Sequence, residues 1–228
     1  MARETVIGLD ASSGGAAVAA LTVGANGSVL MLAARAASEP ARPAAQLVPL
    51  LQRILEDADL KWDRLSAVAV AVGPGSYAGV RSAVVTAKSL AYALGRPLVA
   101  VGSLEAMAFW AESGTNPVWA ALPARRDRVY AAKYRWDDGG LVCTQEASLW
   151  PRAVFWQAVL ASPRCRVVGP PDVAPPTVLA QTVGDGAQVA VAVAHLGFRR
   201  WSTGLCTDPM RLVPTYVSLP EIGPPSGS

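Results

Sequence analysis

Several residue types are scarce in this chain, and each scarcity excludes a class of site. The 228 residues include one histidine, His195, and three cysteines, Cys143, Cys165 and Cys206. One histidine cannot form a His-x-x-x-His metal pair or a two-histidine zinc site. The odd number of cysteines, their wide spacing and the lack of a Cys-x-x-Cys motif argue against a disulfide framework and a zinc ribbon. A lone histidine in a segment rich in alanine and valine is more often packed than catalytic.

Charged residues are also few. They make up 16% of the chain against 52% hydrophobic residues, and the mean hydropathy is +0.30. A disordered chain would be rich in charge and poor in apolar residues, so this class is excluded. The longest uncharged run, 11–34, is interrupted by glycines and an asparagine and does not predict a membrane-spanning helix. Since the first residues show no secretory signal, we expect a cytoplasmic protein.

The basic residues form only small clusters. The net charge is +3, and arginines gather at 125–128 and 199–200. A nucleic-acid-binding protein usually concentrates its basic residues on one face. The sequence alone therefore favours solvated surface over an RNA groove for both clusters.

The first half of the chain alternates strands and helices. Tight turns predict that its first three strands, 5–10, 16–23 and 28–35, are antiparallel. A near-continuous apolar run at 65–72 is typical of a strand buried on both faces. The other predicted elements are helices at 44–58, 77–94 and 103–113 and a strand at 97–101.

The second half repeats this order. We expect three strands at 118–122, 129–136 and 140–150, then a helix at 151–160 and a short strand at 164–168. At 185–200 the alternation of valine and alanine suggests a strand, but the length of the segment favours a helix. The proline-rich tail from Pro209 onward is expected to be extended, with residues 221–228 disordered.

Each half thus begins with three antiparallel strands and continues with helices and parallel strands. This pattern predicts an α/β protein of duplicated ribonuclease H-like domains, as in the actin-like ATPase (ASKHA) fold. We expect an N-terminal domain at 1–113, which carries the partner-binding helices, and a smaller C-terminal domain at 114–220.

A glycine-rich turn, 73–81, joins a buried strand to a helix. Such a turn can hold an anion on free backbone N–H groups. It lacks the lysine of a P-loop, and Pro74 stands where a nucleophile elbow needs glycine. A structural turn is therefore favoured over an anion site. The residues of this predicted structural loop are Gly73, Pro74, Gly75, Ser76, Gly79 and Arg81.

A second candidate loop follows the first strand. Asp10, Ser12 and Ser13 stand where actin-like ATPases place their first phosphate loop. A working ATPase of this class needs an acidic residue at the equivalent point of its second domain, where this chain has Pro123. We therefore interpret the three residues as a vestigial nucleotide loop, and expect no catalytic residue, metal site or bound cofactor.

Five segments carry a resemblance to a known family. They are 8–12, 73–81, 87–95, 97–106 and 124–132. The chain resembles the TsaB (YeaZ) family, subunits of the bacterial machinery that makes threonylcarbamoyladenosine in tRNA. The likeness is dense over 6–134 and weak beyond. Its most specific motif is Gly-Pro-Gly-Ser-aromatic-x-Gly-Val/Leu-Arg, which the family shares with its catalytic paralogue.

The resemblance implies a non-catalytic partner of TsaD, the threonylcarbamoyl transferase. Such a subunit holds TsaD in an active arrangement with the ATPase subunit TsaE, and it meets tRNA only indirectly and no membrane. The modification lies at position 37 of tRNAs that read codons beginning with A. The complex uses ATP and a metal that a His-x-x-x-His pair of TsaD holds, so a chain with one histidine cannot be TsaD. The alternative is an actin-like ATPase or a glycoprotease-type enzyme.

The resemblance also implies where partners bind. TsaB proteins dimerise through the first two helices of domain one, which match 44–58 and 77–94. From the residues alone, the wide apolar faces of these helices could equally pack inside the chain or against a partner, TsaD or a second copy. The predicted partner-binding residues are Leu47, Leu50, Leu51, Ile54, Ala83, Ala87, Leu90, Ala91 and Leu94.

Three positions depart from the family pattern. A histidine usual before the first helix is missing near Pro43, Pro123 replaces an aspartate, and Ser218 replaces a C-terminal arginine. These losses argue against a residual nucleotide contact and leave the scaffold role intact.

Overall fold

The computed structural model describes residues 4–24, 28–37, 43–111, 116–162, 164–178 and 186–217. Ser218 and the tail expected at 221–228 lie outside these ranges, as does the start of the helix expected at 185–200. Within the described residues, no helix combines the length and apolar character that crossing a bilayer would require.

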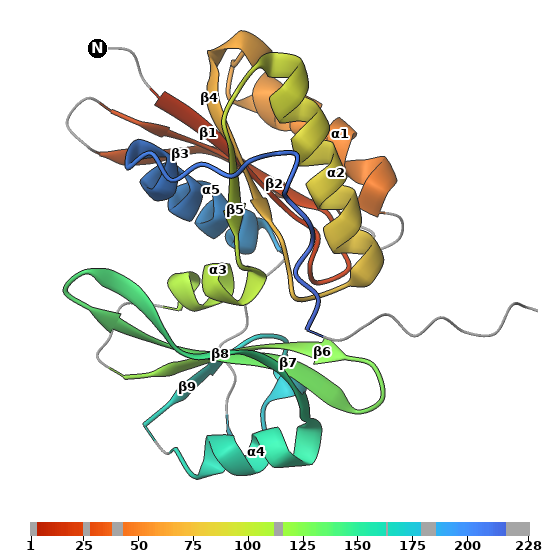
Figure 1. Ribbon diagram of the computed structural model, residues 1–228, viewed down its shortest axis with the longest axis vertical. Coiled ribbons are helices and arrows are strands. Elements are labelled where there is room, and N and C mark those ends of the chain that lie inside the picture. Colours follow the sequence, from red (N-terminus) through yellow and green to blue (C-terminus); the bar gives the residue numbers. More distant parts are fainter. Residues whose placement is uncertain are drawn as a thin grey trace, which may run out of the picture.

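Two β-sheets with flanking helices form the two lobes seen one above the other in Figure 1. The first sheet has the strand order β3-β2-β1-β4-β5. Its strands are β1 (Glu4–Asp10), β2 (Ala17–Val23), β3 (Val29–Ala36), β4 (Leu65–Ala71) and β5 (Leu98–Val101). The first three are antiparallel, whereas β4 runs parallel to β1 and β5 runs parallel to β4.

The second sheet has the order β8-β7-β6-β9 and the same pattern of directions. Three antiparallel strands are followed by a fourth that runs parallel to the first of them. The strands are β6 (Val118–Ala124), β7 (Arg128–Asp137), β8 (Gly140–Pro151) and β9 (Arg166–Val168). The equal order of the two sheets confirms the predicted fold class.

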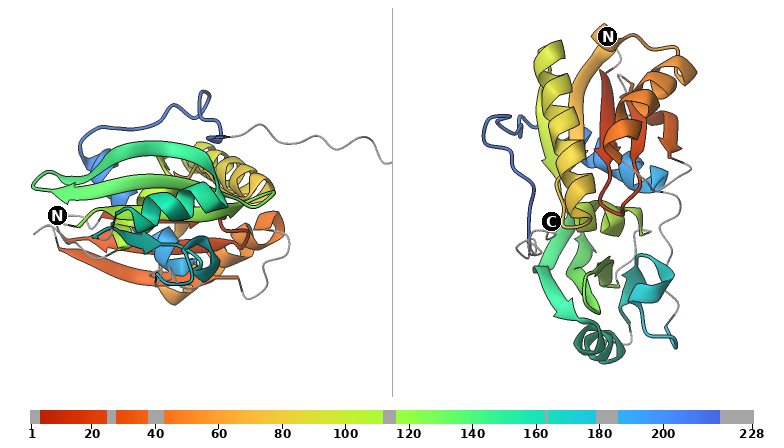
Figure 2. Two further views of the ribbon diagram at one scale, coloured as in Figure 1. Left: turned by 90° about the horizontal axis from the view of Figure 1, so that it is seen from below. Right: turned by 90° about the vertical axis from the view of Figure 1, so that its right-hand side faces the viewer.

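The helices cover the sheets in layers. α1 (Pro43–Asp57) and α2 (Tyr77–Leu94) pack on one face of the first sheet, where they bury Ile7 and Leu9. α5 (Ala187–Ser202) covers the other face, and α3 (Ser103–Trp110) lies between the lobes (Figures 1 and 2). α4 (Arg152–Leu160) packs on the second sheet through Phe155.

α5 is the element whose place the sequence order does not reveal. The alternation of valine and alanine suggested a strand, but the segment is helical, as its length predicted. It falls within the range expected for the second domain, 114–220, yet its alanines Ala190 and Ala194 pack against β1 and β2 of the first sheet. The division of the chain between residues 113 and 114 remains a prediction.

Candidate functional site

The glycine-rich loop lies directly on the turn between β1 and β2. The Ser76 side chain caps α2 by accepting a hydrogen bond from the Gly79 N–H, and the Ser76 N–H donates to the Ser12 carbonyl at 2.6 Å. A Cβ on Gly75 would overlap the Ser12 carbonyl oxygen, and one on Gly79 would overlap that of Ala11. The glycines thus allow two backbones to touch, which supports the structural reading of the loop.

Two other segments fix the start of this loop. The Gly73 N–H donates to the Ser103 Oγ at 3.0 Å, and the Ser103 N–H donates back to the Gly73 carbonyl at 2.9 Å. On the other side, the Thr215 N–H donates to the Val72 carbonyl at 2.7 Å. Gly73 and Pro74 are therefore buried, and Arg81 is the one exposed residue of the predicted loop.

The predicted vestigial nucleotide loop is covered by the same contact. Asp10 is completely buried, Ser12 is buried, and only Ser13 is exposed. The Ser12 N–H donates to Asp10 Oδ1 at 3.1 Å, while Oδ2 has no hydrogen-bond partner among the described residues. Burial raises the pKa of Asp10 to about 6. Because its carboxyl is buried and accepts a hydrogen bond from its own turn, Asp10 is not exposed to a nucleotide in this structure.

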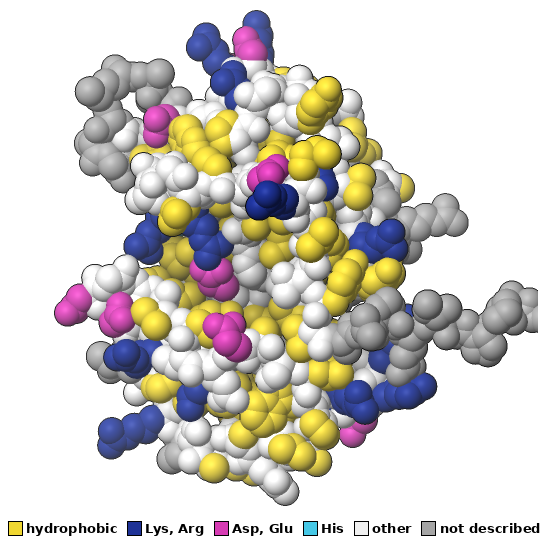
Figure 3. Space-filling view, in the orientation of Figure 1, with side chains coloured by type: hydrophobic (Ala, Val, Ile, Leu, Met, Phe, Trp, Pro, Cys, Tyr) yellow, Lys and Arg dark blue, Asp and Glu magenta, His cyan; other side chains and the backbone are white. Residues whose placement is uncertain are grey.

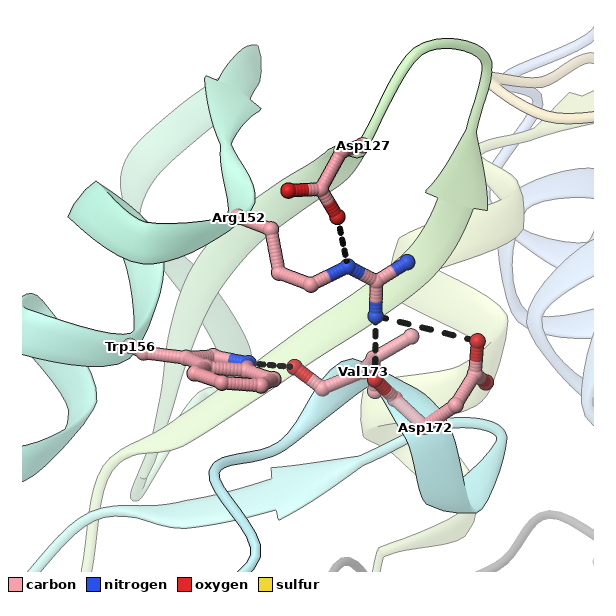
Figure 4. A network of polar contacts seen from close by, with 5 residues as sticks. All are labelled: Asp127, Arg152, Trp156, Asp172 and Val173. Atoms are coloured by element: carbon pink, nitrogen blue, oxygen red, sulfur yellow. Dashed lines mark hydrogen bonds and ion pairs between the residues drawn. The ribbon is translucent and has the colours of Figure 1, made fainter.

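The hairpin between β6 and β7 stands at the equivalent point of the second lobe. Its one acidic residue, Asp127, is already engaged, because Arg152 Nε donates to Asp127 Oδ1 at 2.7 Å. Arg152 also donates to the Asp172 carbonyl, and Trp156 Nε1 donates to the Val173 carbonyl at 3.0 Å (Figure 4). The network ties the hairpin to α4 and to the turn at 171–173, so Asp127 cannot replace the aspartate that Pro123 displaces.

A cavity of about 380 Å³ opens between the lobes. Arg200 of α5 and Glu105 of α3 form an ion pair of 2.6 Å in its wall, and Arg200 also donates to the Ala100 carbonyl. The pKa of the Tyr134 hydroxyl and that of the Cys143 thiol are raised, mainly by burial, so both groups stay protonated at neutral pH. Cys143 is therefore not poised as a nucleophile.

His195 packs against an aromatic ring. The His195 ring meets Phe109 edge-on at 4.9 Å, and burial and Arg199 lower its pKa. Among the residues that the structure describes, no three His, Cys, Asp or Glu side chains gather where they could hold a metal ion.

The structure places the predicted partner-binding residues on the inner faces of α1 and α2. Most are buried in the core of the chain itself, and two are partly buried against it. The buried ones are Leu47, Leu50, Leu51, Ile54, Ala83, Ala87 and Ala91, and the partly buried ones are Leu90 and Leu94. A large apolar stripe next to a sheet fills that sheet's core first, so the seven buried side chains face the sheet, whereas Leu90 and Leu94 keep part of their surface exposed.

The outer faces of the same helices carry residues that the sequence interpretation did not assign to partner binding. Val85 is 62% exposed and Tyr92 is 88% exposed on α2, and Val48 is exposed on α1. Val85 and Tyr92 are seven residues apart, which is two helical turns and so one face. This spacing is the sequence signal that could have identified the outer face.

Comparison with known proteins finds relatives in sequence and in structure. The family model described as TsaD, tRNA N6-adenosine threonylcarbamoyltransferase, matches residues 41–148. The tRNA threonylcarbamoyladenosine biosynthesis protein TsaB of Bacillus subtilis (strain 168) is 39% identical over 92 residues, 40% of each chain. TsaB of Escherichia coli (strain K12) is 35% identical over 98 residues, 42% of each chain. The chain thus spans about two fifths of the length of these curated relatives.

Solved structures extend the likeness to nearly the whole chain. A Pseudomonas aeruginosa protein described as similar to peptidase YEAZ is 27% identical, with a TM-score of 0.71, over 94% of this chain and 100% of that one. YeaZ from Pseudomonas aeruginosa, 24% identical, shares the fold with a TM-score of 0.68 over 93% of this chain and 99% of that one. The matched stretch and the fold thus agree that this chain is similar to proteins of the TsaB (YeaZ) family.

Proposed function

We propose that this chain is the non-catalytic subunit that binds the transferase TsaD during formation of threonylcarbamoyladenosine at position 37 of tRNAs that read codons beginning with A. The names of the curated relatives support a role in the synthesis of threonylcarbamoyladenosine in tRNA. The family model that matches residues 41–148 is itself named for the transferase, and this supports a chain related to TsaD in fold.

The observation that carries the proposal is the outer surface of α1 and α2. The two helices pack against each other and turn their large apolar residues toward the first sheet. Figure 1 shows them on the flank of the first lobe, with only the N-terminal end of α2 near the seam between the lobes. Val48, Val85 and Tyr92 remain exposed on this flank. Tyrosine is enriched among the residues that dominate binding energy, so Tyr92 suits the centre of an interface.

Catalysis by this chain is not supported by its polar groups. Asp10 is buried away from solvent, and Asp127 is held by Arg152. The chain has one histidine, whereas the resemblance implies a histidine pair around the metal of TsaD. The enzyme alternatives, an actin-like ATPase and a glycoprotease, are therefore less favoured than a scaffold.

The remaining partners follow from this role. TsaE and tRNA would meet the chain through the complex, in the cytoplasm. A homodimer of the isolated chain would use the same outer face of α1 and α2. TsaD and a second copy would then compete for one surface, so TsaD should convert dimers into mixed complexes.

A matched pair of variants tests the interface. Val85→Glu places a charge on the outer face of α2, and Val154→Glu makes the same change at an exposed valine of α4, at the far end of the second lobe. We expect Val85→Glu to weaken binding to TsaD of the same organism at least tenfold in calorimetry, and Val154→Glu to leave it unchanged. Both should melt like the wild type. Unchanged binding by Val85→Glu would place the interface elsewhere.

ATP turnover tests the non-catalytic assignment. The purified chain should not hydrolyse ATP, and adding it to TsaD should raise threonylcarbamoyl transfer to tRNA. Steady hydrolysis by the chain alone that Asp10→Asn abolishes would overturn the scaffold assignment in favour of an ATPase.

A further inference from the structure

Two tyrosines that are distant in sequence form a ring pair at the surface. Tyr77 is the first residue of α2, and Tyr216 lies near the end of the described chain, which the Thr215–Val72 hydrogen bond holds beside the glycine-rich loop. Their ring centroids are 5.1 Å apart, with 35° between the planes. The residues are 40% and 43% exposed. A half-exposed aromatic pair leaves π-surface available to a further flat group.

An arginine completes this cluster. The Arg81 guanidinium lies 5.2 Å from the centroid of the Tyr77 ring, and Arg81 Nη1 donates to the Tyr77 hydroxyl at 2.9 Å. Arg81 is exposed, and no described carboxylate forms an ion pair with it. The guanidinium therefore keeps a positive charge and free N–H donors beside the rings.

The hairpin between β6 and β7 adds three exposed arginines, Arg125, Arg126 and Arg128. Arg126 and Asp127 have positive φ angles of 57° and 52°, which residues other than glycine rarely adopt. The Arg152 network in Figure 4 holds the turn in this conformation. It also neutralises Asp127, so the hairpin has a net positive charge and a fixed shape.

The two clusters lie on the same side of the molecule. Figures 1 and 2 both place the N-terminal end of α2 and the β6–β7 hairpin at the edge of the seam between the lobes. In Figure 3, dark blue side chains gather over the hairpin, and most acidic side chains of this view lie over other parts of the molecule. Tyr77, Arg81, Tyr216 and the three hairpin arginines together are called the Tyr–Arg surface below.

We propose that the Tyr–Arg surface binds a single-stranded segment of RNA directly. Single-stranded RNA is recognised by stacking of unpaired bases on aromatic rings and arginine planes, with basic side chains along the backbone. Tyr77, Tyr216 and Arg81 supply the stacking platform, and the hairpin arginines supply phosphate contacts. An acidic peptide could pair its carboxylates with the arginines, but it would not account for the exposed pair of tyrosine rings.

This inference goes beyond the proposed function, which brings tRNA to the chain only through TsaD. Sequence alone favours solvated surface for the arginines at 125–128. The structure adds the ring pair, the exposed Arg81 and the rigid turn, none of which can be seen in the local sequence. The Tyr–Arg surface adjoins the outer face of α2, because Arg81 and Val85 are one helical turn apart. The two surfaces share no residue, so different variants test RNA binding and TsaD binding.

Fluorescence anisotropy of the purified chain with a labelled 12-nucleotide single-stranded RNA tests the proposal. Four arginine contacts predict a slope of log affinity against log salt of about −3, because each phosphate contact on a single strand contributes about −0.7. Tyr216→Ala should weaken binding about tenfold, since a stacked base is sensitive to loss of its ring. Tyr216→Phe keeps the ring and should keep the affinity.

Arginine variants separate specific contacts from general charge. Arg81→Gln should weaken binding and make the slope shallower by about 0.7. Arg211→Gln removes the same charge from an exposed position near the chain end and should leave binding unchanged. The proposal is overturned if the wild type does not bind RNA at 50 mM salt, if Tyr216→Ala binds as well as Tyr216→Phe, or if a duplex of the same length binds as tightly as the single strand.

Discussion

Gly75 lies so close to Ser12 that a single methyl group on Gly75 would overlap the Ser12 carbonyl oxygen. The next residue, Ser76, donates its N–H to that same carbonyl at 2.6 Å. The two loops that resemble phosphate-binding loops are thus bound to each other. Their backbones are occupied by this contact, which makes it a part of the scaffold that positions α2.

Gly75→Ala should therefore lower the free energy of unfolding, by about 1–3 kcal/mol, because overpacking forces a backbone shift. Gly15→Ala is a matched control in the neighbouring turn, where an added Cβ meets nothing within 4 Å. Urea unfolding of the three proteins measures the difference. If Gly75→Ala keeps the wild-type stability but abolishes binding of a nucleotide, the loop is an anion site instead.

Leu51→Ala should destabilise the chain by about 2–5 kcal/mol, the range for a large buried residue replaced by alanine. Leu51 is buried between α1 and the first sheet, whereas Val48 on the same helix is exposed. Val48→Ala should leave stability nearly unchanged. The same burial means that Leu51→Glu and Ala87→Arg should unfold the protein. A folded Leu51→Glu variant with wild-type melting would show that this side chain is not in the core.

Asp10 should make the chain less stable as pH rises. Its folded-state pKa of about 6 exceeds the ordinary value of 3.8, so the folded chain binds this proton more tightly than the unfolded chain. The contribution to stability is complete below about pH 4 and is lost as pH rises through 6. The shift corresponds to about 3 kcal/mol. Asp10→Asn cannot titrate and should remove this slope from urea midpoints measured between pH 4 and 7; an unchanged slope would contradict the assignment.

Arg152→Gln should destabilise the second lobe by about 1 kcal/mol, through loss of charge-assisted hydrogen bonds from a largely buried guanidinium. Arg152 is 18% exposed and joins Asp127 to the Asp172 carbonyl. The exposed pair of Arg211 and Asp208 is the control, since pairs of this kind contribute little. Thermal melts of Arg152→Gln and Arg211→Gln give the comparison. Equal melting temperatures would show that the network in Figure 4 adds nothing to stability.

Local sequence was sufficient for the elements and for much of their order. Apolar alternation and tight turns predicted β1 to β3 and β6 to β8 as antiparallel triplets, and the structure has them. The motif at 73–81 supplied the family resemblance, and the comparisons agree with it. The apolar pattern and the motif each lie within a short stretch of chain, so they can be recognised without knowing the tertiary structure.

Local sequence did not predict whether the apolar face of a helix packs against the sheet or against a partner. α1 and α2 have wide apolar stripes, and their sequences fit packing on a sheet as well as packing on a partner. Only the position of the first sheet shows that Leu47, Leu51 and Ala87 face inward. Once the buried residues of α1 and α2 are known, Val85 and Tyr92 can be identified as residues of the outer face.

The sequence by itself determined the strands, the helices and their duplicated order, because periodicity and turn residues act over a few positions, and its motifs supplied the family resemblance. The tertiary structure alone decided which surfaces remain open. α5 returns to the first sheet, and the chain end brings Tyr216 to Tyr77. These are contacts between residues far apart in the chain, and no local pattern encodes them, because the burial of one segment depends on where the others fold.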